Sequence, residues 1–318
     1  MKLTKHIVVT LIFTLLFIGC KSYKEELIIG ISPWPGYEPL VLAMEQGFYA
    51  EAGVKIVRYP TPTESFRALR DGVVDVAAFT VDEALHYAEV YDKPKIILIL
   101  DVSNGGDALV VRPDIKTLDA LKGKRIGVEP SALGDYLLSR SMDFTQGIQR
   151  KDIKIVPIEV GMHLQAYKER KVDALMTYNP SKNQLIDAGA HVLFDSSQIP
   201  YEVVDVLVTN NKVMKEKKDQ LIVLKKGWFQ ALSYIQAHRK EAMEKMGRYE
   251  HMDANEFDAA FSELLIPSME ENIEMLNDKN SHLYKAVNKL SKLMFDKGTL
   301  SSQVKTDALF DPTILMAH

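Results

Sequence analysis

The stretch at residues 103–107, SNGGD, lies between two apolar runs of strand length at 96–100 and 108–111. Its consecutive glycines, Gly105 and Gly106, allow backbone conformations that residues with a side chain disfavour. Taken alone, this pattern is typical of a loop between two strands. The chain on either side is repeated, however, and the repetition predicts that residues 103–107 are a hinge between two similar lobes.

Strand-like and helix-like segments alternate before this hinge. Apolar runs of strand length lie at 27–32, 54–59, 75–80 and 96–100. Helices are predicted between them, at about 39–48, 63–70 and 81–90. Strands that alternate with helices predict an α/β fold in which helices cover both faces of a largely parallel sheet.

The same order of segments returns after the hinge. The matched positions are Gly30 with Gly127, 54–57 with 153–156, and 74–77 with 172–175, at offsets of 97, 99 and 98 residues. Three matches within two residues of one spacing predict two lobes of similar layout. Ligands of open α/β sheets bind beside the carboxyl ends of the strands, so the two lobes should face each other across a binding cleft.

Beyond residue 210 the pattern changes to helices without intervening strands. Leu221, Leu224 and Trp228 recur on one helical face, and Asp253 with Glu256 predicts a capping box. We interpret this region as a return into the first lobe. The predicted organisation is a signal peptide at 1–19, a tether at 20–26, lobe 1 at 27–102 and 206–318, lobe 2 at 107–205, and crossovers at 103–107 and 201–209.

The N-terminus has the layout of a secretory signal. Lys2 and Lys5 precede an apolar run at 7–18, which is short for a membrane span. The run ends at Cys20, the only cysteine of the 318 residues, so no intramolecular disulfide can form. The sequence therefore predicts export of a chain held together by its hydrophobic core.

The charge balance argues against nucleic acid as a partner. The formal charge is −4, and it becomes −6 once residues 1–19, with two lysines and no acidic residue, are removed. The basic run at 215–218 (KEKK) has no interleaved aromatic residues and is typical of a solvated helix face.

Sequence signatures of catalysis are absent. The chain has no phosphate-binding glycine loop ending in lysine, no paired-histidine metal motif and no serine in a nucleophile elbow. His163 is the one histidine predicted near the cleft, and a lone histidine at a helix start is usually exposed. We therefore predict a protein that is not an enzyme and that uses neither a cofactor nor a metal.

Three segments carry a resemblance to a known family: AMEQGFYAEAGV (43–54), LRDGVVDV (69–76) and LDALKGKRIG (118–127). With them the chain resembles the solute-binding proteins of ABC importers in the nitrate, sulfonate (taurine) and thiamine-precursor group. The resemblance implies a type II periplasmic-binding fold: two lobes, each a mixed sheet with helices on both faces, two crossovers, a cleft that closes on a small molecule, and additional C-terminal helices.

The resemblance also implies partners and a location. The family delivers its solute to a membrane permease with its ATPase, usually as a monomer. Cys20 after the apolar run resembles the lipobox of bacterial lipoproteins, which implies an exported, membrane-anchored protein. Pyrimidine-synthase relatives of the same fold depend on a cysteine-rich segment, and this chain has none because Cys20 is its sole cysteine.

The first lobe supplies one predicted wall of the cleft. The loop at 32–37 (SPWPGY) follows the first strand, and its prolines restrict the backbone around Trp34 and Tyr37. The alternative for Trp34 is an aromatic patch that covers a neighbouring helix. The remaining candidates at strand ends of this lobe are Thr61, Phe79, Thr80 and Asp82; a hydroxyl such as that of Thr61 can equally be a helix cap.

The second lobe and the crossovers supply the opposite wall. The candidates are Glu129, Ser131, Tyr178 and Asn179 in the second lobe, and Asp107 and Asp205 at the crossovers. In the family, the turn that matches 129–133 commonly presents a hydroxyl and helix amides to a ligand head group, which suits Ser131. An N-cap that serves only its own helix is an equally good explanation for Ser131.

Acidic residues outnumber basic ones at these strand ends. Carboxylates are expected at Asp82, Asp107, Glu129, Glu159 and Asp205, whereas Arg67, Arg112, Lys124 and Arg125 fall where a helix or strand surface is the simpler assignment. Carboxylates beside aromatic rings suit an amine or a cationic ring. The alternative is that these carboxylates face water or cap helices.

The ligand is therefore predicted as a small polar organic molecule, amine-bearing, zwitterionic or N-heterocyclic, within a range that includes taurine-like and pyrimidine-like solutes. Two roles fit the sequence. In the first, the protein delivers its ligand to an ABC importer. In the second, the liganded protein docks on a membrane signalling sensor. Both need a hinge and a surface that forms on closure.

Overall fold

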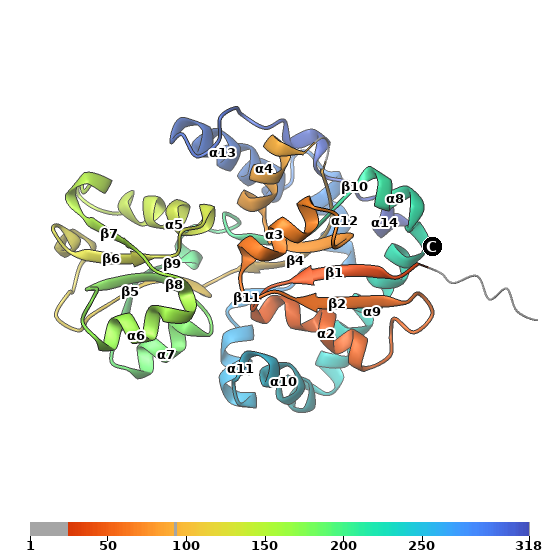
Figure 1. The fold of residues 1–318 in the computed structure, drawn as a ribbon, viewed down its shortest axis with the longest axis horizontal. Coiled ribbons are helices and arrows are strands. Elements are labelled where there is room, and N and C mark those ends of the chain that lie inside the picture. The colour runs from red at the N-terminus through yellow and green to blue at the C-terminus, as the bar shows by residue number, and fades with distance from the viewer. Residues whose placement is uncertain (1–24, 92–93, 318) are drawn as a thin grey trace, which may run out of the picture.

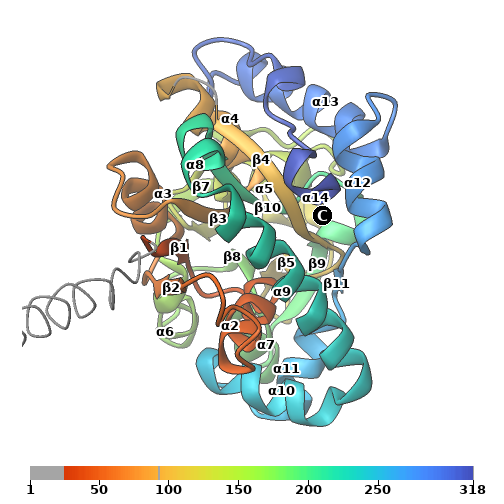
Figure 2. The same cartoon turned by 90° about the vertical axis from the view of Figure 1, so that its right-hand side faces the viewer.

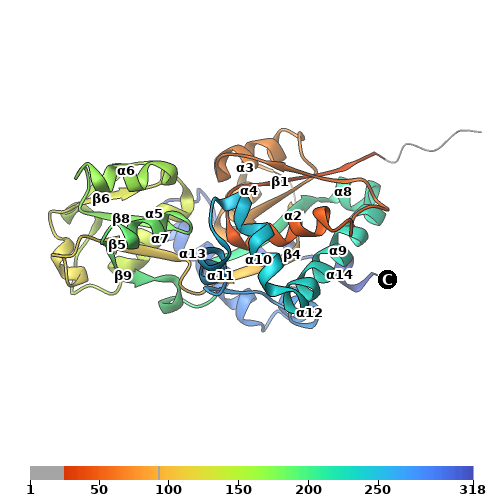
Figure 3. The same ribbon diagram turned by 90° about the horizontal axis from the view of Figure 1, so that it is seen from below.

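The computed structural model describes residues 25–91 and 94–317, and the predicted signal segment with Cys20 lies outside them. Two sheets, each flanked by helices, form two lobes that lie side by side (Figures 1 and 3). We call the lobe around the six-stranded sheet lobe 1 and the lobe around the five-stranded sheet lobe 2. The predicted two-lobed α/β fold is confirmed.

Lobe 1 has the strand order β11-β4-β10-β3-β1-β2. Its strands are β1 (Leu27–Ile31), β2 (Val54–Arg58), β3 (Val76–Thr80), β4 (Pro94–Ser103), β10 (Val204–Asn210) and β11 (Leu264–Leu265). The helices in its first half are α2 (Glu38–Glu45), α3 (Pro62–Arg70) and α4 (Val81–Val90). Strands β2 and β3 run parallel to β1, while β10 runs antiparallel to both β3 and β4, so the sheet is mixed.

Lobe 2 has the strand order β7-β6-β8-β5-β9. Its strands are β5 (Asp107–Val111), β6 (Arg125–Val128), β7 (Lys154–Pro157), β8 (Ala174–Tyr178) and β9 (His191–Asp195), and its helices are α5 (Ala132–Met142), α6 (His163–Lys168) and α7 (Ser181–Asp187). Strand β5 is antiparallel to its neighbours β8 and β9, and β6 is parallel to β7 and β8. This sheet is therefore mixed as well.

The repeat found in the sequence is a repeat of structure. Gly30 in β1 lies in register between β2 and β3, and Gly127 in β6 lies in register between β7 and β8. One matched pair also makes the same hydrogen bond. Asp75 accepts from the backbone N–H of Ile28, and Asp173 accepts from that of Arg125, each at 2.8 Å.

The chain passes between the lobes twice. Residues 104–106 join β4 to β5, and a 3-10 turn (Ser196–Gln198) with residues 199–203 joins β9 to β10. Of the predicted second crossover at 201–209, residues 204–209 belong to β10, which is paired on both sides within the sheet of lobe 1. Asp205 therefore lies in lobe 1, because β10 completes the sheet there as β5 does in lobe 2.

Helices complete lobe 1 after β10, as the sequence predicted, but the short strand β11, which the sequence did not predict, lies between two of them and pairs with β4. The helices are α8 (Asn211–Glu216), α9 (Lys218–Ala237), α10 (Arg239–Gly247), α11 (Ala254–Phe261), α12 (Met269–Asn277), α13 (His282–Asp296) and α14 (Thr313–Met316). The predicted capping box of Asp253 and Glu256 begins α11. Figure 2 shows α12 and α14 beside β4, which both helices contact.

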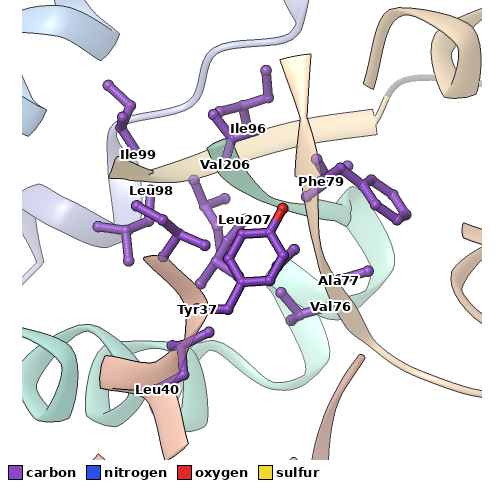
Figure 4. Packing of buried hydrophobic residues seen from close by; sticks show 14 of the residues in the cluster. Tyr37, Leu40, Val76, Ala77, Phe79, Ile96, Leu98, Ile99, Val206 and Leu207 are labelled. Atoms are coloured by element: carbon purple, nitrogen blue, oxygen red, sulfur yellow. The ribbon is translucent and has the colours of Figure 1, made fainter. Parts of the chain in front are cut away.

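The core of lobe 1 gathers side chains from distant parts of the sequence. Phe79, Ile96 and Leu207 are fully buried and come from three adjacent strands (Figure 4). Trp228 is also fully buried, as its helical spacing predicted. Within residues 25–91 and 94–317, no helix has both the length and the apolar character needed to cross a membrane.

Candidate functional site

A narrow cavity that opens to solvent lies between the two lobes, and the space free of atoms in it, open solvent included, is about 420 Å³. Lobe 1 and the second crossover contribute Ser32, Pro33, Trp34, Tyr37, Pro62, Thr80, Glu83, Val203 and Asp205, and lobe 2 contributes Asp107, Glu129, Ser131, Leu133 and Tyr178. The strand ends that the repeat predicted to face each other therefore do so.

The loop after β1 forms the aromatic wall of the cavity. Pro35 begins a 3-10 turn, η1 (Pro35–Tyr37), where its missing N–H is not needed. The indole Nε1 of Trp34 donates to Asp101 Oδ2 at 3.1 Å, and the hydroxyl of Tyr37 donates to Asp205 Oδ1. Both rings are held by buried carboxyl groups, so little side-chain freedom remains to be lost on binding.

Aromatic contact joins the two lobes at the cavity. The ring of Trp34 meets the ring of Tyr178 edge to face, with 5.9 Å between centroids and 79° between planes. Tyr178 is the last residue of β8 and pairs with Asp107 at the start of β5. The hydroxyl of Tyr178 lies 3.4 Å from Glu129 Oε1. The base of the cavity therefore combines rings and carboxylates from both lobes.

Glu83 is a cavity residue that the sequence interpretation missed. Its Oε2 accepts hydrogen bonds from the backbone N–H and the hydroxyl of Thr80, each at 3.1 Å, in a capping box at the start of α4. The threonine-to-glutamate spacing at 80–83 is the sequence signal for this box. This capping glutamate in the first turn of α4 brings its carboxyl group to the cavity.

Burial raises the pKa values of the carboxyl groups at this site. The pKa of Glu83 is raised to about 8 by burial and by the neighbouring Asp82. The pKa of Asp107 is raised to about 7, because burial outweighs the hydrogen bond from Ser103 and the attraction of Lys182. Burial also raises the pKa of Glu129. Near neutral pH Glu83 therefore holds a proton and Asp107 is partly protonated, and a bound cation can displace these protons.

One carboxylate oxygen of Asp107 receives no hydrogen bond from the described residues. Its side chain is 2% exposed, and its Oδ2 has no hydrogen-bond partner among the described residues. A buried carboxylate oxygen without a donor costs free energy, so it favours a ligand that supplies an N–H or O–H group.

The basic residues considered from the sequence lie outside the cavity lining. Arg112 donates to the carbonyl oxygens of Val172 and Tyr167, Arg125 pairs with Asp173, and Arg67 is exposed. Lys124 is half-buried and does not line the cavity. Within the described residues, the cavity lining contains no lysine, arginine or histidine.

Eight of the twelve predicted ligand-binding residues line the cavity: Trp34, Tyr37, Thr80, Asp107, Glu129, Ser131, Tyr178 and Asp205. Ser131 also caps α5, since its hydroxyl accepts from the N–H of Gly134 at 3.1 Å. Ser131 therefore lines the cavity and caps its own helix, and its contact with a ligand head group stays a prediction.

The other four predicted residues have different places. Thr61 caps α3 by accepting from Glu64, and Phe79 lies in the core between Phe66 and Tyr87. Asp82 and Asn179 are buried beside the cavity without lining it. Asn179 donates to Glu263 Oε2 at 2.7 Å and so joins lobe 2 to lobe 1.

Two expectations from single residues were wrong. Glu159 is exposed and does not line the cavity. His163 is fully buried, with Nδ1 at 3.0 Å from the hydroxyl of Thr177 and Nε2 at 3.1 Å from the carbonyl oxygen of Ile158. Burial lowers its pKa to about 4, so it is a neutral structural residue at physiological pH.

Two lobes with matched sheets, two crossovers and a polar cavity between them define the type II periplasmic-binding class of fold. The chain belongs to the NMT1-like family, whose model matches residues 21–248. The resemblance to ABC-importer solute-binding proteins that the sequence suggested is confirmed at the level of family and fold.

Solved structures support the assignment of the fold. The aliphatic sulphonate binding protein SsuA from Escherichia coli superposes with a TM-score of 0.76 at 16% identity, covering 91% of this chain and 93% of that one. The alkanesulfonate-binding protein SsuA from Xanthomonas axonopodis pv. citri, bound to MOPS, gives 0.72 at 15%, with coverages of 88% and 95%.

A third structure has a similar fold. The ligand-binding component of an ABC-type import system from Staphylococcus aureus, with zinc bound, gives a TM-score of 0.75 at 12% identity, covering 92% of this chain and 98% of that one. No curated protein sequence matches this chain significantly. Within the described residues, no group of three or more His, Cys, Asp or Glu side chains is placed to hold a metal ion.

Proposed function

We propose that this protein is the exported solute-binding component of an ABC importer and that it captures a small, cation-bearing organic solute between its lobes. The family and the fold support the role in uptake. The carboxylate-rich, aromatic cavity supports the ligand class. The protein binds and releases this solute without converting it.

The acidic lining is the observation that carries the proposal. Four carboxyl groups, those of Glu83, Asp107, Glu129 and Asp205, line one cavity with Trp34, Tyr37 and Tyr178. A simple anion such as nitrate or a sulfonate finds no cationic side chain among the described lining residues, whereas an ammonium or amidinium group gains cation–π contacts and ion pairs with the carboxyl groups that lose their protons on binding. A zwitterion fits if its anionic end lies away from Asp107.

The connections between the lobes support capture by closure. Lys182 of lobe 2 donates to Glu263 of lobe 1 at 2.5 Å and to the carbonyl oxygen of Gly105 in the first crossover at 2.7 Å. Beside the second crossover, Glu202 accepts from Arg140 of α5 at 2.6 Å and from Lys289 of α13 at 3.0 Å. A ligand that bridges both lobes adds to these contacts and shifts the equilibrium toward the closed form.

A thermal-shift panel tests the ligand class directly. The protein without its signal peptide is melted with small amines, amidines, pyrimidines, zwitterions, taurine-like sulfonates and inorganic oxyanions. A ligand that binds only the folded state raises the melting temperature with concentration, and we expect this from members that carry a cationic group. The matched control is Glu159→Gln, which removes an exposed carboxylate outside the cavity. Stabilisation by simple anions alone would contradict the proposal.

We also propose that Cys20 anchors the protein to a membrane. The lone cysteine directly after the apolar run at 7–18 supports lipid attachment. Intact-mass measurement of the protein from a membrane fraction should give a chain that begins at Cys20 with added acyl mass. Cys20→Ala should give a chain without that mass, released from the membrane.

A further inference from the structure

Two carboxyl groups lie directly behind the aromatic wall. Asp101 of β4 and Asp205 of β10 are register partners on adjacent antiparallel strands. Asp101 is completely buried and Asp205 is 2% exposed. Asp101 is absent from the cavity lining, so the proposed binding function does not itself use this residue.

Each of these carboxyl groups holds one ring of the wall. Asp101 Oδ2 accepts from the indole of Trp34, and Asp205 Oδ1 accepts from the hydroxyl of Tyr37. Gly36, which lies between Trp34 and Tyr37 in the chain, is packed against Asp101, since a Cβ there would be 1.9 Å from Asp101 Oδ2. No larger residue fits at Gly36 unless Asp101 moves.

The remaining oxygen of Asp101 lacks a donor. Asp101 Oδ1 is buried and has no hydrogen-bond partner among the described residues. The ionisable groups that act on the pair from neighbouring elements are Tyr37 of η1, Glu83 of α4 and Asp107 of β5. Lys182 of α7 acts on Asp107 and is bonded to Glu263 and Gly105. Two adjacent buried charges without a cation of their own would repel strongly.

We propose that Asp205 carries a proton, which it donates to an ionised Asp101, and that this one-proton pair positions Trp34 and Tyr37 for ligand binding. With that proton, Asp101 Oδ1 gains its missing donor while Oδ2 still accepts from Trp34. Asp205 Oδ1 remains free to accept from Tyr37. Asp101 and Asp205 are thus positioning residues for the aromatic wall. The inference rests on the proposed function in one respect, namely that this wall binds the ligand.

The direction of the pKa shifts agrees with this division of roles. Burial raises the pKa of Asp101 to about 7, and the hydrogen bond from Trp34 opposes that rise. Burial and the charge of Asp101 raise the pKa of Asp205 well above its ordinary value. Asp101 therefore ionises first as the pH rises, and Asp205 keeps its proton to a higher pH.

The two tryptophans of the chain allow a test that needs no ligand. In protein labelled with 5-fluorotryptophan, ¹⁹F NMR gives one resonance from Trp34 and one from Trp228, and Trp34→Phe assigns them. We expect the Trp34 resonance to shift with a midpoint near pH 7 as Asp101 ionises, and to change again at higher pH as Asp205 loses its proton. Trp228 is fully buried in α9, and its resonance is the internal control.

Conservative variants separate positioning from a general effect on folding. Asp101→Asn retains an acceptor for the indole and should abolish the transition near pH 7. Asp205→Asn replaces the donated proton with an amide N–H, so it should keep the wall in place and remove the transition at higher pH. The Trp228 resonance shows whether each variant is folded, and either variant alone suffices for the test.

Two results would overturn the inference. One is a Trp34 resonance that does not move between pH 5 and pH 9 in the folded protein. The other is an unchanged transition in Asp101→Asn, which would assign the titration to Asp107 or Glu83. Since no ligand is present, failure of the thermal-shift panel leaves this test unaffected, and failure here leaves the proposed function standing.

Discussion

The loops that follow the matched strands β1 and β6 bring different side chains to the cavity. In lobe 1 the segment at 32–37 is SPWPGY, and in lobe 2 the segment at 129–134 is EPSALG, at the same offset of 97 residues as Gly30 and Gly127. Both have a proline in second place. Trp34, however, corresponds to Ser131, so a rigid aromatic wall faces a capped helix start.

The two lobes share the backbone of their sheets, and they differ in the side chains of the loops that line the cavity. The strands, their register and the Asp75 and Asp173 hydrogen bonds are shared between lobes because both sheets need the same backbone geometry. The strand-end loops contribute little to those sheets, and their side chains could diverge. We therefore expect Trp34 of lobe 1 to contribute more to binding than Ser131 of lobe 2, although Asp107, Glu129 and Tyr178 of lobe 2 also line the cavity.

The largest expected contrast is between Trp34→Ala and Ser131→Ala. Removing the central aromatic anchor should weaken binding of the best ligand from the panel by roughly 30-fold or more, as for a binding hot spot. Ser131→Ala should change affinity less than tenfold, because its hydroxyl mainly caps α5. Isothermal titration calorimetry measures both variants. If the two variants bound the ligand with affinities within twofold of each other, the expected difference between the two loops would be contradicted.

The next contrast is among the carboxylates. Asp107→Asn should weaken binding of a cationic ligand roughly tenfold or more, because it removes a buried charge with an unsatisfied oxygen. Glu129→Gln in lobe 2 should have a smaller effect, because Glu129 is bonded to Tyr178. Glu159→Gln is the control, since Glu159 is exposed. An equal loss for all three variants would indicate long-range attraction rather than a specific contact.

A third contrast concerns stability. Asp75→Ala should lower the free energy of unfolding by about 2–3 kcal/mol, because it also leaves the buried ammonium of Lys217 without its partner at 2.8 Å. Asp173→Ala should cost about 1–2 kcal/mol, because Arg125 can still reach water. Urea denaturation monitored by circular dichroism compares the two. A larger loss for Asp173→Ala would show that exposure does not explain the difference.

The smallest expected effect is a dependence on pH. The pKa values of Asp107 and Glu83, about 7 and about 8, lie above those of the unfolded chain. The folded state therefore binds more protons between about pH 4 and pH 8, and the ligand-free protein loses stability as pH rises through that window. Binding of a cation, which requires ionised carboxylates, should strengthen instead.

Thermal shifts at pH 6 and pH 8 distinguish these two trends. The melting temperature without ligand should be lower at pH 8, and the increase caused by a saturating cationic ligand should be larger there. Glu83→Gln should reduce the difference between the two pH values more than Glu129→Gln does. A ligand-induced increase that is the same at both pH values would show that these protons are not displaced on binding.

Local sequence patterns determined the alternation of strands and helices, the repeat and the strand ends that face the cavity. Apolar runs of strand length and helical spacing depend on neighbours along the chain, and the constant offset placed Gly30 and Gly127 in equivalent strands. Trp34, Tyr37 and Asp107 could be named as candidates because the carboxyl ends of strands in an α/β sheet share one edge.

Only the tertiary structure decided which of those residues meet. Phe79 and Trp34 are both aromatic residues near strand ends, yet Phe79 points into the core and Trp34 lines the cavity. Asp101 follows the apolar run at 96–100 and had no predicted role, and its partner Asp205 is 104 residues away on β10. Antiparallel insertion of β10 beside β4 creates that pair, and such long-range pairing is not encoded in local periodicity.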